Sequence, residues 1–174
     1  MAIIALQIGG EWYGEVTEYQ HTVRFPAETE DQALSDAQRY YDEEVMPEIR
    51  RDSAKRLISF AETQVENLTA QYPPTERDGW HEKLRIAKDI LSGAAGNSDA
   101  TFFAQLATLR GDADVIAYAE RIVAKAKTFK QMSFTIHEIK NRALKDIANA
   151  KDEISVHALE RNAETEIYKF NEVA

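Results

Sequence analysis

The part of the chain after Gly111 contains neither glycine nor proline, and this absence constrains the fold more than any other sequence feature. Between Ile122 and Ala158, apolar residues recur in ten steps over 36 residues, an average of 3.6 per step, which is the period of a straight α-helix. The pattern predicts one helix that reaches about Phe170 and is roughly 80–90 Å long at ~1.5 Å per residue. Because the other helices of the chain are too short to cover it, this helix either folds back at a break that the pattern does not show or packs against another chain. We favour the other chain.

Charge along this segment changes sign once. Residues 121–151 carry 8 bases and 2 acids, whereas residues 152–172 carry 6 acids and 2 bases. Opposed blocks favour antiparallel or staggered contact with a neighbour. The basic block alone could suggest nucleic acid, but few aromatic residues accompany it and the whole chain has a net charge of −9. We therefore expect no nucleic-acid partner.

The acidic excess lies in the first 48 residues, which hold 11 acids and 2 bases, whereas residues 49–174 hold 19 of each. This segment favours a basic partner surface, or it is simply a solvated acidic face. The shift divides the chain into residues 1–48, an acidic hairpin with a capped helix, and residues 49–174, a helical body. The chain contains no cysteine, which excludes disulfides and thiol catalysis, and no apolar run approaches the ~20 residues of a membrane span.

The N-terminal segment is rich in β-branched and aromatic residues on both sides of Gly9-Gly10, which predicts a β-hairpin. Neither face of the second run is cleanly apolar, so we expect a bulge near Gly14 or an edge position, and a third strand if the run bends. Pro26 ends this region. Thr29 and Gln32 then form a capping box that starts a helix, and Pro47 should kink or end that helix near Val45–Met46.

Four helical segments follow in residues 49–174. A narrow apolar seam runs through Ala54, Ile58, Ala61, Val65, Leu68 and Tyr72, and Pro73-Pro74 ends it. A capping box of Thr75 and Asp78 predicts the next start, with Trp80, Leu84, Ala87 and Leu91 on one face and Gly93 as the C-cap. A short helix from Ser98 carries Phe102, Phe103, Leu106 and Leu109 and ends at Gly111. The predicted fold is mainly α with a small N-terminal β-hairpin (α+β), and its C-terminal part is a helical bundle or resembles a coiled coil.

No pattern in the chain indicates catalysis. The sequence HEIKN, residues 137–141, nearly matches a helical zinc-protease motif, but Asn141 replaces the second imidazole, so a ligand is missing. Gly9, Gly10 and Gly14 precede no Lys-Ser/Thr pair and form no phosphate-binding loop. The paired acids lie on predicted helix surfaces, where carboxylates are usually solvated. We expect no enzyme, no cofactor and no metal.

Candidate contact residues are therefore aromatic or belong to the long apolar seam. Tyr and Trp combine a large contact area with a polar group, which suits protein–protein interfaces. The alternative is that most of these rings pack in the chain's own core. The candidate partner contacts are Trp12, Tyr13, Tyr19, Tyr40, Tyr41, Trp80, Phe129, Ile139 and Ile147.

The stretch YPPTERDGWHEKLRIAKDIL, residues 72–91, resembles a segment near the C-termini of tailed-bacteriophage tail-fibre and tail-fibre-assembly proteins. The matches are Tyr72, Pro73, Glu76, Arg77, Trp80 and Leu91, and in the next stretch, ATFFAQLATLRG, they are Thr101, Leu106, Ala107, Arg110 and Gly111. ADVIAYAERIVAKAKTF resembles the family's following helix. The resemblance spans about residues 50–148, and the chain has His81 and Phe102 where the family commonly has proline.

The resemblance implies a non-enzymatic bacteriophage tail protein that is made in the host cytoplasm. It would be either a small virion component near the baseplate and tail fibres or a tail-fibre-assembly factor. Its partners would be other tail, baseplate or fibre proteins, and we expect an oligomer within an assembly, with no membrane contact. The alternative is a phage-encoded inhibitor that presents its acidic hairpin to a basic groove of a host factor.

Overall fold

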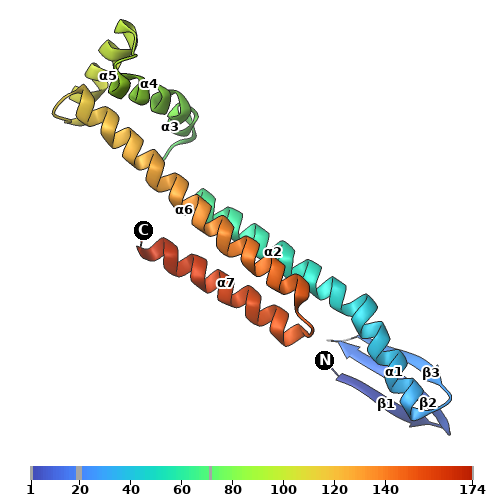
Figure 1. The fold of residues 1–174 in the computed structure, drawn as a ribbon. Helices are drawn as coiled ribbons and strands as arrows, with labels where there is room; N and C mark the ends of the chain where they lie inside the picture. Colours follow the sequence, from blue (N-terminus) through green and yellow to red (C-terminus); the bar gives the residue numbers. More distant parts are fainter. Residues whose placement is uncertain (1, 19–20, 71, 174) are drawn as a thin grey trace. The chain divides into compact units, whose positions relative to one another are not determined.

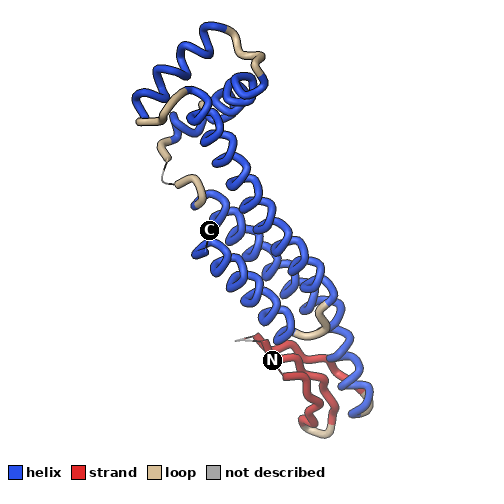
Figure 2. Tube along the Cα trace, turned by 60° about the vertical axis from the view of Figure 1, so that its left-hand side comes forward, coloured by secondary structure: helices blue, strands red, loops and turns tan. Residues whose placement is uncertain are grey.

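In the computed structural model, which describes residues 2–18, 21–70 and 72–173, the chain forms a small antiparallel sheet and a set of helices. The predicted class, mainly α with a small N-terminal β part, is confirmed (Figures 1 and 2). The chain divides into two compact units. Unit 1 contains residues 1–57 and 143–162, and unit 2 contains residues 58–142 and 163–174.

The sheet of unit 1 has three strands in the order β1-β2-β3, all antiparallel. Strand β1 (Ala2–Ile8) turns through Gly9 and Gly10 into β2 (Glu11–Glu18), and β3 (His21–Ala27) follows. Both glycines have positive φ, 63° and 94°, as a two-residue type I′ turn requires. The predicted hairpin and the third strand are therefore confirmed. Pro26 lies inside β3, an edge strand, where its missing N–H is tolerated.

The expected bulge near Gly14 is wrong, because the register runs unbroken through it, with Ala5 and Phe25 opposite, and the alternative of an edge position is wrong because β2 is the central strand. Gly14 is instead required by helix α1 (Glu30–Tyr40), which packs on all three strands. A Cβ at this position would lie 2.0 Å from the carbonyl oxygen of Ala33. The missing side chain of Gly14 thus lets the helix backbone approach the sheet.

Helix α1 begins as the sequence predicts. The Thr29 hydroxyl accepts a hydrogen bond from the Gln32 N–H at 3.2 Å, and the Gln32 side chain accepts one from the Glu28 N–H. A π-helical turn, η1 (Tyr41–Val45), connects α1 to α2 (Met46–Asn67), and the Met46 N–H bonds the carbonyl of Tyr41. Pro47 therefore marks a change of helix type at the predicted position rather than the end of a helix.

The long C-terminal helix is broken, which corrects the preferred interpretation of its apolar stripe. Helix α6 (Val115–Asn149) ends, and α7 (Glu153–Val173) begins after three residues. Within unit 2, Arg142 of α6 pairs with Glu166 of α7, which shows that α7 runs back along α6. The part of the stripe from Ile136 to Ile147 is buried within the chain, and the part from Ile122 to Met132 is half-buried.

Two polar contacts produce this break in a stretch that has no glycine or proline. The carboxylate of Asp152 caps α7, accepting from the Ser155 N–H and hydroxyl at 2.8 Å each. The Arg50 guanidinium of α2 donates to the carbonyl of Ala150, at 2.9 Å from Nε. Because that carbonyl lies past the end of α6, Arg50 satisfies an acceptor that the ending helix leaves unpaired.

Unit 2 contains three short helices, α3 (Pro74–Asp78), α4 (Trp80–Ser92) and α5 (Asn97–Arg110). The predicted Thr75 cap is wrong, because α3 starts at Pro74 with Pro73 as its N-cap, and proline suits a first helical position. Gly93 and Gly111 are left-handed C-caps, as predicted. The core of these helices and the start of α6 consists of Ile86, Ala87, Ile90, Phe103, Ala107, Tyr118 and Ala119.

Candidate functional site

The most developed polar site is a buried carboxylate on α7. Glu160 is 7% exposed and receives hydrogen bonds from three groups of α2. Arg56 donates through Nε to Oε1 at 2.7 Å and through Nη2 to Oε2 at 2.8 Å, and the Ser53 hydroxyl donates to Oε2 at 2.7 Å. Burial raises the pKa of Glu160, but the bonds from Arg56 and Ser53 outweigh it, and the pKa lies below its ordinary value.

This arrangement stabilises the fold of unit 1 and is poorly suited to catalysis. Both oxygens of Glu160 are occupied by donors from the same chain, so the carboxylate has no opening toward a substrate. The His157 imidazole lies between two carboxylates, with Nδ1 3.7 Å from Oε2 of Glu160 and Nε2 3.6 Å from Oε1 of Glu153. Among the described residues, no group of three or more His, Asp or Glu side chains could hold a metal ion. Ser53 is fully buried in α2 because it pairs with this carboxylate.

The predicted aromatic contacts of residues 1–48 differ in exposure. Trp12 and Tyr13 are half-buried on opposite faces of β2. The Tyr13 hydroxyl donates to Glu11 at 2.8 Å, and this bond raises the pKa of Tyr13. Tyr40 is half-buried against Phe25, with ring centroids 4.9 Å apart. Tyr19 lies outside the described residues.

Tyr41 is only 4% exposed and belongs to the interior of unit 1. Burial raises the pKa of its hydroxyl, which lies near the backbone of Glu153 at the start of α7. That contact has no regular hydrogen-bond geometry, and the hydroxyl has no other partner within the described chain. The ring is therefore a core side chain of the π-helical turn.

Trp80, the first residue of α4, lies in an aromatic cluster of unit 2. Trp80 contacts Tyr72 edge-on at 5.1 Å and Phe129 of α6 at 6.3 Å between ring centroids. The Lys125 ammonium lies 5.9 Å from the centre of the Tyr72 ring. Both Trp80 and Phe129 are half-buried. The cluster joins the start of α4 to α6. The aromatic residues around Pro73-Pro74 therefore have a structural role, at the junction between helices.

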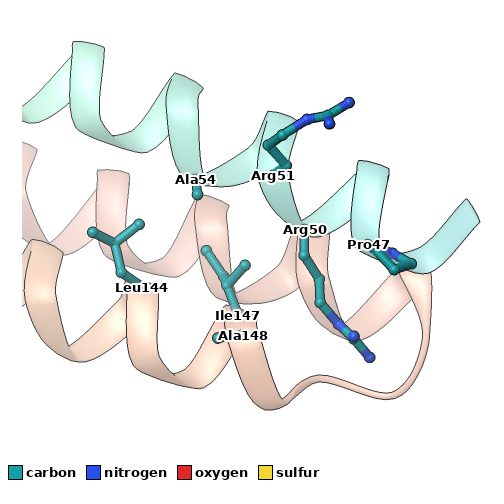
Figure 3. A pocket seen from close by; sticks show the side chains of 7 residues that line it. All are labelled: Pro47, Arg50, Arg51, Ala54, Leu144, Ile147 and Ala148. Atoms are coloured by element: carbon teal, nitrogen blue, oxygen red, sulfur yellow. The ribbon is translucent and has the colours of Figure 1, made fainter. Parts of the chain in front are cut away.

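The two seam residues chosen as partner contacts are buried in their own chain. Ile139 is 5% exposed and Ile147 is 1% exposed, both on α6. A role for either in binding another protein stays a prediction. In unit 1, Ile147 also lines a shallow groove of about 320 Å³ between α2 and α6, and Figure 3 shows Ile147 and Leu144 pointing toward α2. Arg51 points away from it, and no acid or imidazole lines this groove.

An exposed apolar surface of unit 2 is the outer face of α5, defined by Ser98, Phe102, Gln105 and Leu109. Phe102 is 50% exposed and Leu109 is 81% exposed. They are seven residues apart, so they share one face of the helix, opposite the buried Phe103 and Ala107. Phe102 contacts the buried Phe103 ring at 6.3 Å between centroids, but half of its side chain and most of Leu109 remain exposed. The result is a helix with apolar residues on two faces, one buried and one largely exposed.

The charges of α5 leave this outer face uncharged. Its two charged residues, Asp99 and Arg110, pair with Arg85 at 3.3 Å and with Glu76 at 3.5 Å. The sequence interpretation treated Phe102, Phe103, Leu106 and Leu109 as one set and therefore missed the outer face. The signal was present in the spacing, because Phe102 and Leu109 form one stripe, and Phe103, Leu106 and Ala107 form another.

Comparison with protein-family models, with curated proteins and with solved structures found no match to this chain. Within the described residues, no helix is both long and apolar enough to span a bilayer.

Proposed function

We propose that this protein is a non-enzymatic bacteriophage tail protein, either a small component near the baseplate and fibres or a fibre-assembly factor. It binds another tail protein through the outer face of α5. The observation that carries the proposal is the pair of exposed apolar side chains, Phe102 and Leu109, on a helix whose sequence belongs to the segment that resembles tail-fibre proteins.

The chemistry of this face suits a protein partner. Apolar side chains on an uncharged helix face gain free energy when a partner removes them from water, by about 25 cal/mol per Å² of apolar area. Leu91, at the end of the neighbouring helix α4, is a further exposed apolar side chain of unit 2, at 40%. Such a surface fits the apolar groove of another protein, with recognition by residues at helical spacing.

The fold-back of α7 changes what the proposal requires. Because Ile139 and Ile147 are buried by their own chain, the protein does not need a partner to cover this part of the stripe of α6. In this proposal the partner binds at α5 rather than along the buried part of α6. This property suits an assembly factor and a peripheral tail component equally.

The test uses phage particles produced with the variant Leu109→Lys, which places a charge on the outer face of α5. We expect this variant to lose its place in purified virions, measured by quantitative mass spectrometry, or to give particles without fibres, seen by electron microscopy. The first result identifies a tail component and the second an assembly factor. Thr108→Lys, at the neighbouring exposed position, is the matched control and should behave as wild type.

Two results would contradict the proposal. One is a protein absent from virions whose Leu109→Lys variant still gives particles with a full set of fibres. The other is that the protein binds a host factor and inhibits it, that replacing acids in residues 1–48 with neutral residues abolishes this inhibition, and that phage tails assemble normally in either case. The second result would favour the inhibitor, for which the acidic excess of that segment is the supporting observation.

A further inference from the structure

The two edges of the sheet in unit 1 differ in a way that bears on self-association. In the two-residue hairpin, Ile8 and Glu11 form a hydrogen-bonded pair, so every second residue of β1 directs its backbone groups toward β2. The N–H and C=O groups of Ile3, Ala5 and Gln7 therefore point outward. In the described part of the chain, the backbone hydrogen bonds of β1 go to β2 alone.

Strand β1 has none of the features by which natural sheets block their edges. Its sequence, AIIALQI, contains no charged residue and no proline. The opposite edge, β3, has both: Arg24 lies at its centre, and Pro26 lacks an N–H at an outward position. Charges and prolines at an edge prevent pairing with another strand, so β3 is protected and β1 is open.

We propose that a second copy of this chain binds along β1, antiparallel, about a two-fold axis at Ala5. Ala5 would then exchange hydrogen bonds with Ala5 of the second copy, and Ile3 would pair with Gln7. These are the residues whose backbone groups point outward, so the register satisfies all of them. The two sheets of three strands become one continuous sheet of six. This inference does not depend on the phage-tail proposal.

The side chains of β1 fit the same register. Ile4 and Ile8 project from the sheet face opposite α1 and are 39% and 49% exposed. About the proposed axis, Ile4 lies opposite Leu6 of the second copy, and Ile8 lies opposite Ala2. Every cross-axis pair on this face is apolar, and such pairs stabilise a sheet.

Charge selects this edge and a second copy as its occupant. Pairing through β3 about its centre would place Arg24 opposite Arg24, a repulsive contact, whereas pairing through β1 opposes no charges. The nearest acid across the sheet from Ile4 is Glu15, and Arg24 Nε binds it at 2.7 Å. That bond lowers the pKa of Glu15, and the positive charge of Arg24 balances the negative charge of this carboxylate beside the interface.

Analytical ultracentrifugation of the full chain tests the dimer. We expect the wild type to sediment as a dimer and Gln7→Pro, which removes one outward N–H from an exposed residue, to shift to monomer with an unchanged circular dichroism spectrum. Leu109→Lys, on α5, should remain a dimer. A wild type that is monomeric up to about 100 μM would overturn the inference, since that concentration corresponds to only weak association.

A cross-link tests the register without relying on a disruptive change. The chain has no cysteine, so Ala5→Cys introduces a single thiol. Hydrogen-bonded opposite residues have Cα atoms about 5.5 Å apart, within the range for a disulfide. We expect a disulfide-linked dimer of Ala5→Cys under oxidising conditions and none for Arg24→Cys, the matched position on β3. A linked Arg24→Cys dimer, or an unlinked Ala5→Cys chain, would show that β1 is not the interface.

Discussion

Two apolar helix surfaces, the stripe of α6 and the outer face of α5, have opposite outcomes in this molecule. The α6 stripe is long and regular, yet its residues Ile136, Ile139 and Ile147 are buried within the chain. The outer face of α5 is short and inconspicuous in the sequence, yet Phe102 and Leu109 remain exposed. The regular pattern belongs to the interior, and the inconspicuous one is the stronger candidate for an interface.

The difference arises because periodicity shows that an apolar face exists but not what covers it. For α6 the answer depends on a chain reversal, which Asp152 and Arg50 bring about through polar contacts. For α5 one face is already used by the core around Phe103, and on the second face Phe102 and Leu109 remain 50% and 81% exposed.

The largest expected effect on the free energy of unfolding comes from a change in the buried stripe of α6. Ile147→Glu places a carboxylate at a position that is 1% exposed, without a partner. We expect the free energy of unfolding to fall by about 4 kcal/mol or more, measured by urea denaturation. Ile154→Glu, at a position 80% exposed on α7, is the control and should change stability by less than about 0.5 kcal/mol. Equal effects of the two variants would mean that Ile147 is not buried within the chain.

A smaller effect is expected from Glu160→Gln, which weakens the contact between α2 and α7. Loss of the charge accepted from Arg56 and Ser53 should cost about 2 kcal/mol at pH 7. Equilibrium denaturation of both proteins across a series of pH values measures this difference. An unchanged stability at pH 7 would show that the carboxylate is not engaged.

The same variant has a defined pH dependence. The folded-state pKa of Glu160 lies below its unfolded value of about 4.5, so unfolding at intermediate pH takes up a proton and becomes easier as the pH falls. The contribution is complete above about pH 4.5 and is lost as the pH falls through the folded pKa. The stability difference between wild type and Glu160→Gln should therefore shrink below that pH. A difference that stays constant into acid would contradict the assigned pKa direction.

Removing the cap of α7 should have an intermediate to small effect. Asp152→Ala leaves the N–H of Ser155 without its acceptor, and loss of an N-cap typically costs about 1 kcal/mol. Thermal unfolding by circular dichroism measures the change. Asp146→Ala, at an exposed position on α6, should be close to neutral. If the two variants lose the same stability, the reversal does not depend on the cap.

The smallest effect on stability is expected at the outer face of α5. Leu109→Lys exchanges a side chain that is 81% exposed, so the free energy of unfolding should stay within about 0.5 kcal/mol of wild type. Denaturation of the purified variant checks this value. A larger loss would mean that Leu109 is covered inside the chain, and the face of α5 would then no longer be a candidate interface.

The parts of the fold that follow from local chemistry could be predicted from the sequence. Gly9-Gly10 specifies a hairpin turn, Thr29 specifies a helix start, and Gly93 and Gly111 specify helix ends, each through the backbone conformation of a few neighbouring residues. These signals act within a few positions along the chain. Their outcome therefore does not depend on what packs against them.

The parts that escaped prediction depend on residues far apart in the sequence. The end of α6 is satisfied by Arg50, a hundred residues away, and the polar Ser53 is buried because it meets Glu160. The change of charge between Lys151 and Asp152 was visible, and it coincides with the break, but we interpreted it as a contact with a neighbour. Trp80 and Phe129 were both predicted as partner contacts, but their contact with each other, 6.3 Å between ring centroids, joins residues 49 positions apart and could not be inferred from the local pattern.

The π-helical turn at Tyr41–Val45 has a consequence for how α1 and α2 are phased. Each residue of an α-helix advances the side-chain direction by about 100°, and a π turn accommodates one extra residue. Deleting a single residue from this turn would restore ordinary helical winding and rotate α2 by roughly that angle relative to α1. Ser53 would then no longer face Glu160 of α7, while Ala33 and Ala37 kept their places on the sheet. A one-residue insertion thus sets which side of a continuous helical segment each half buries.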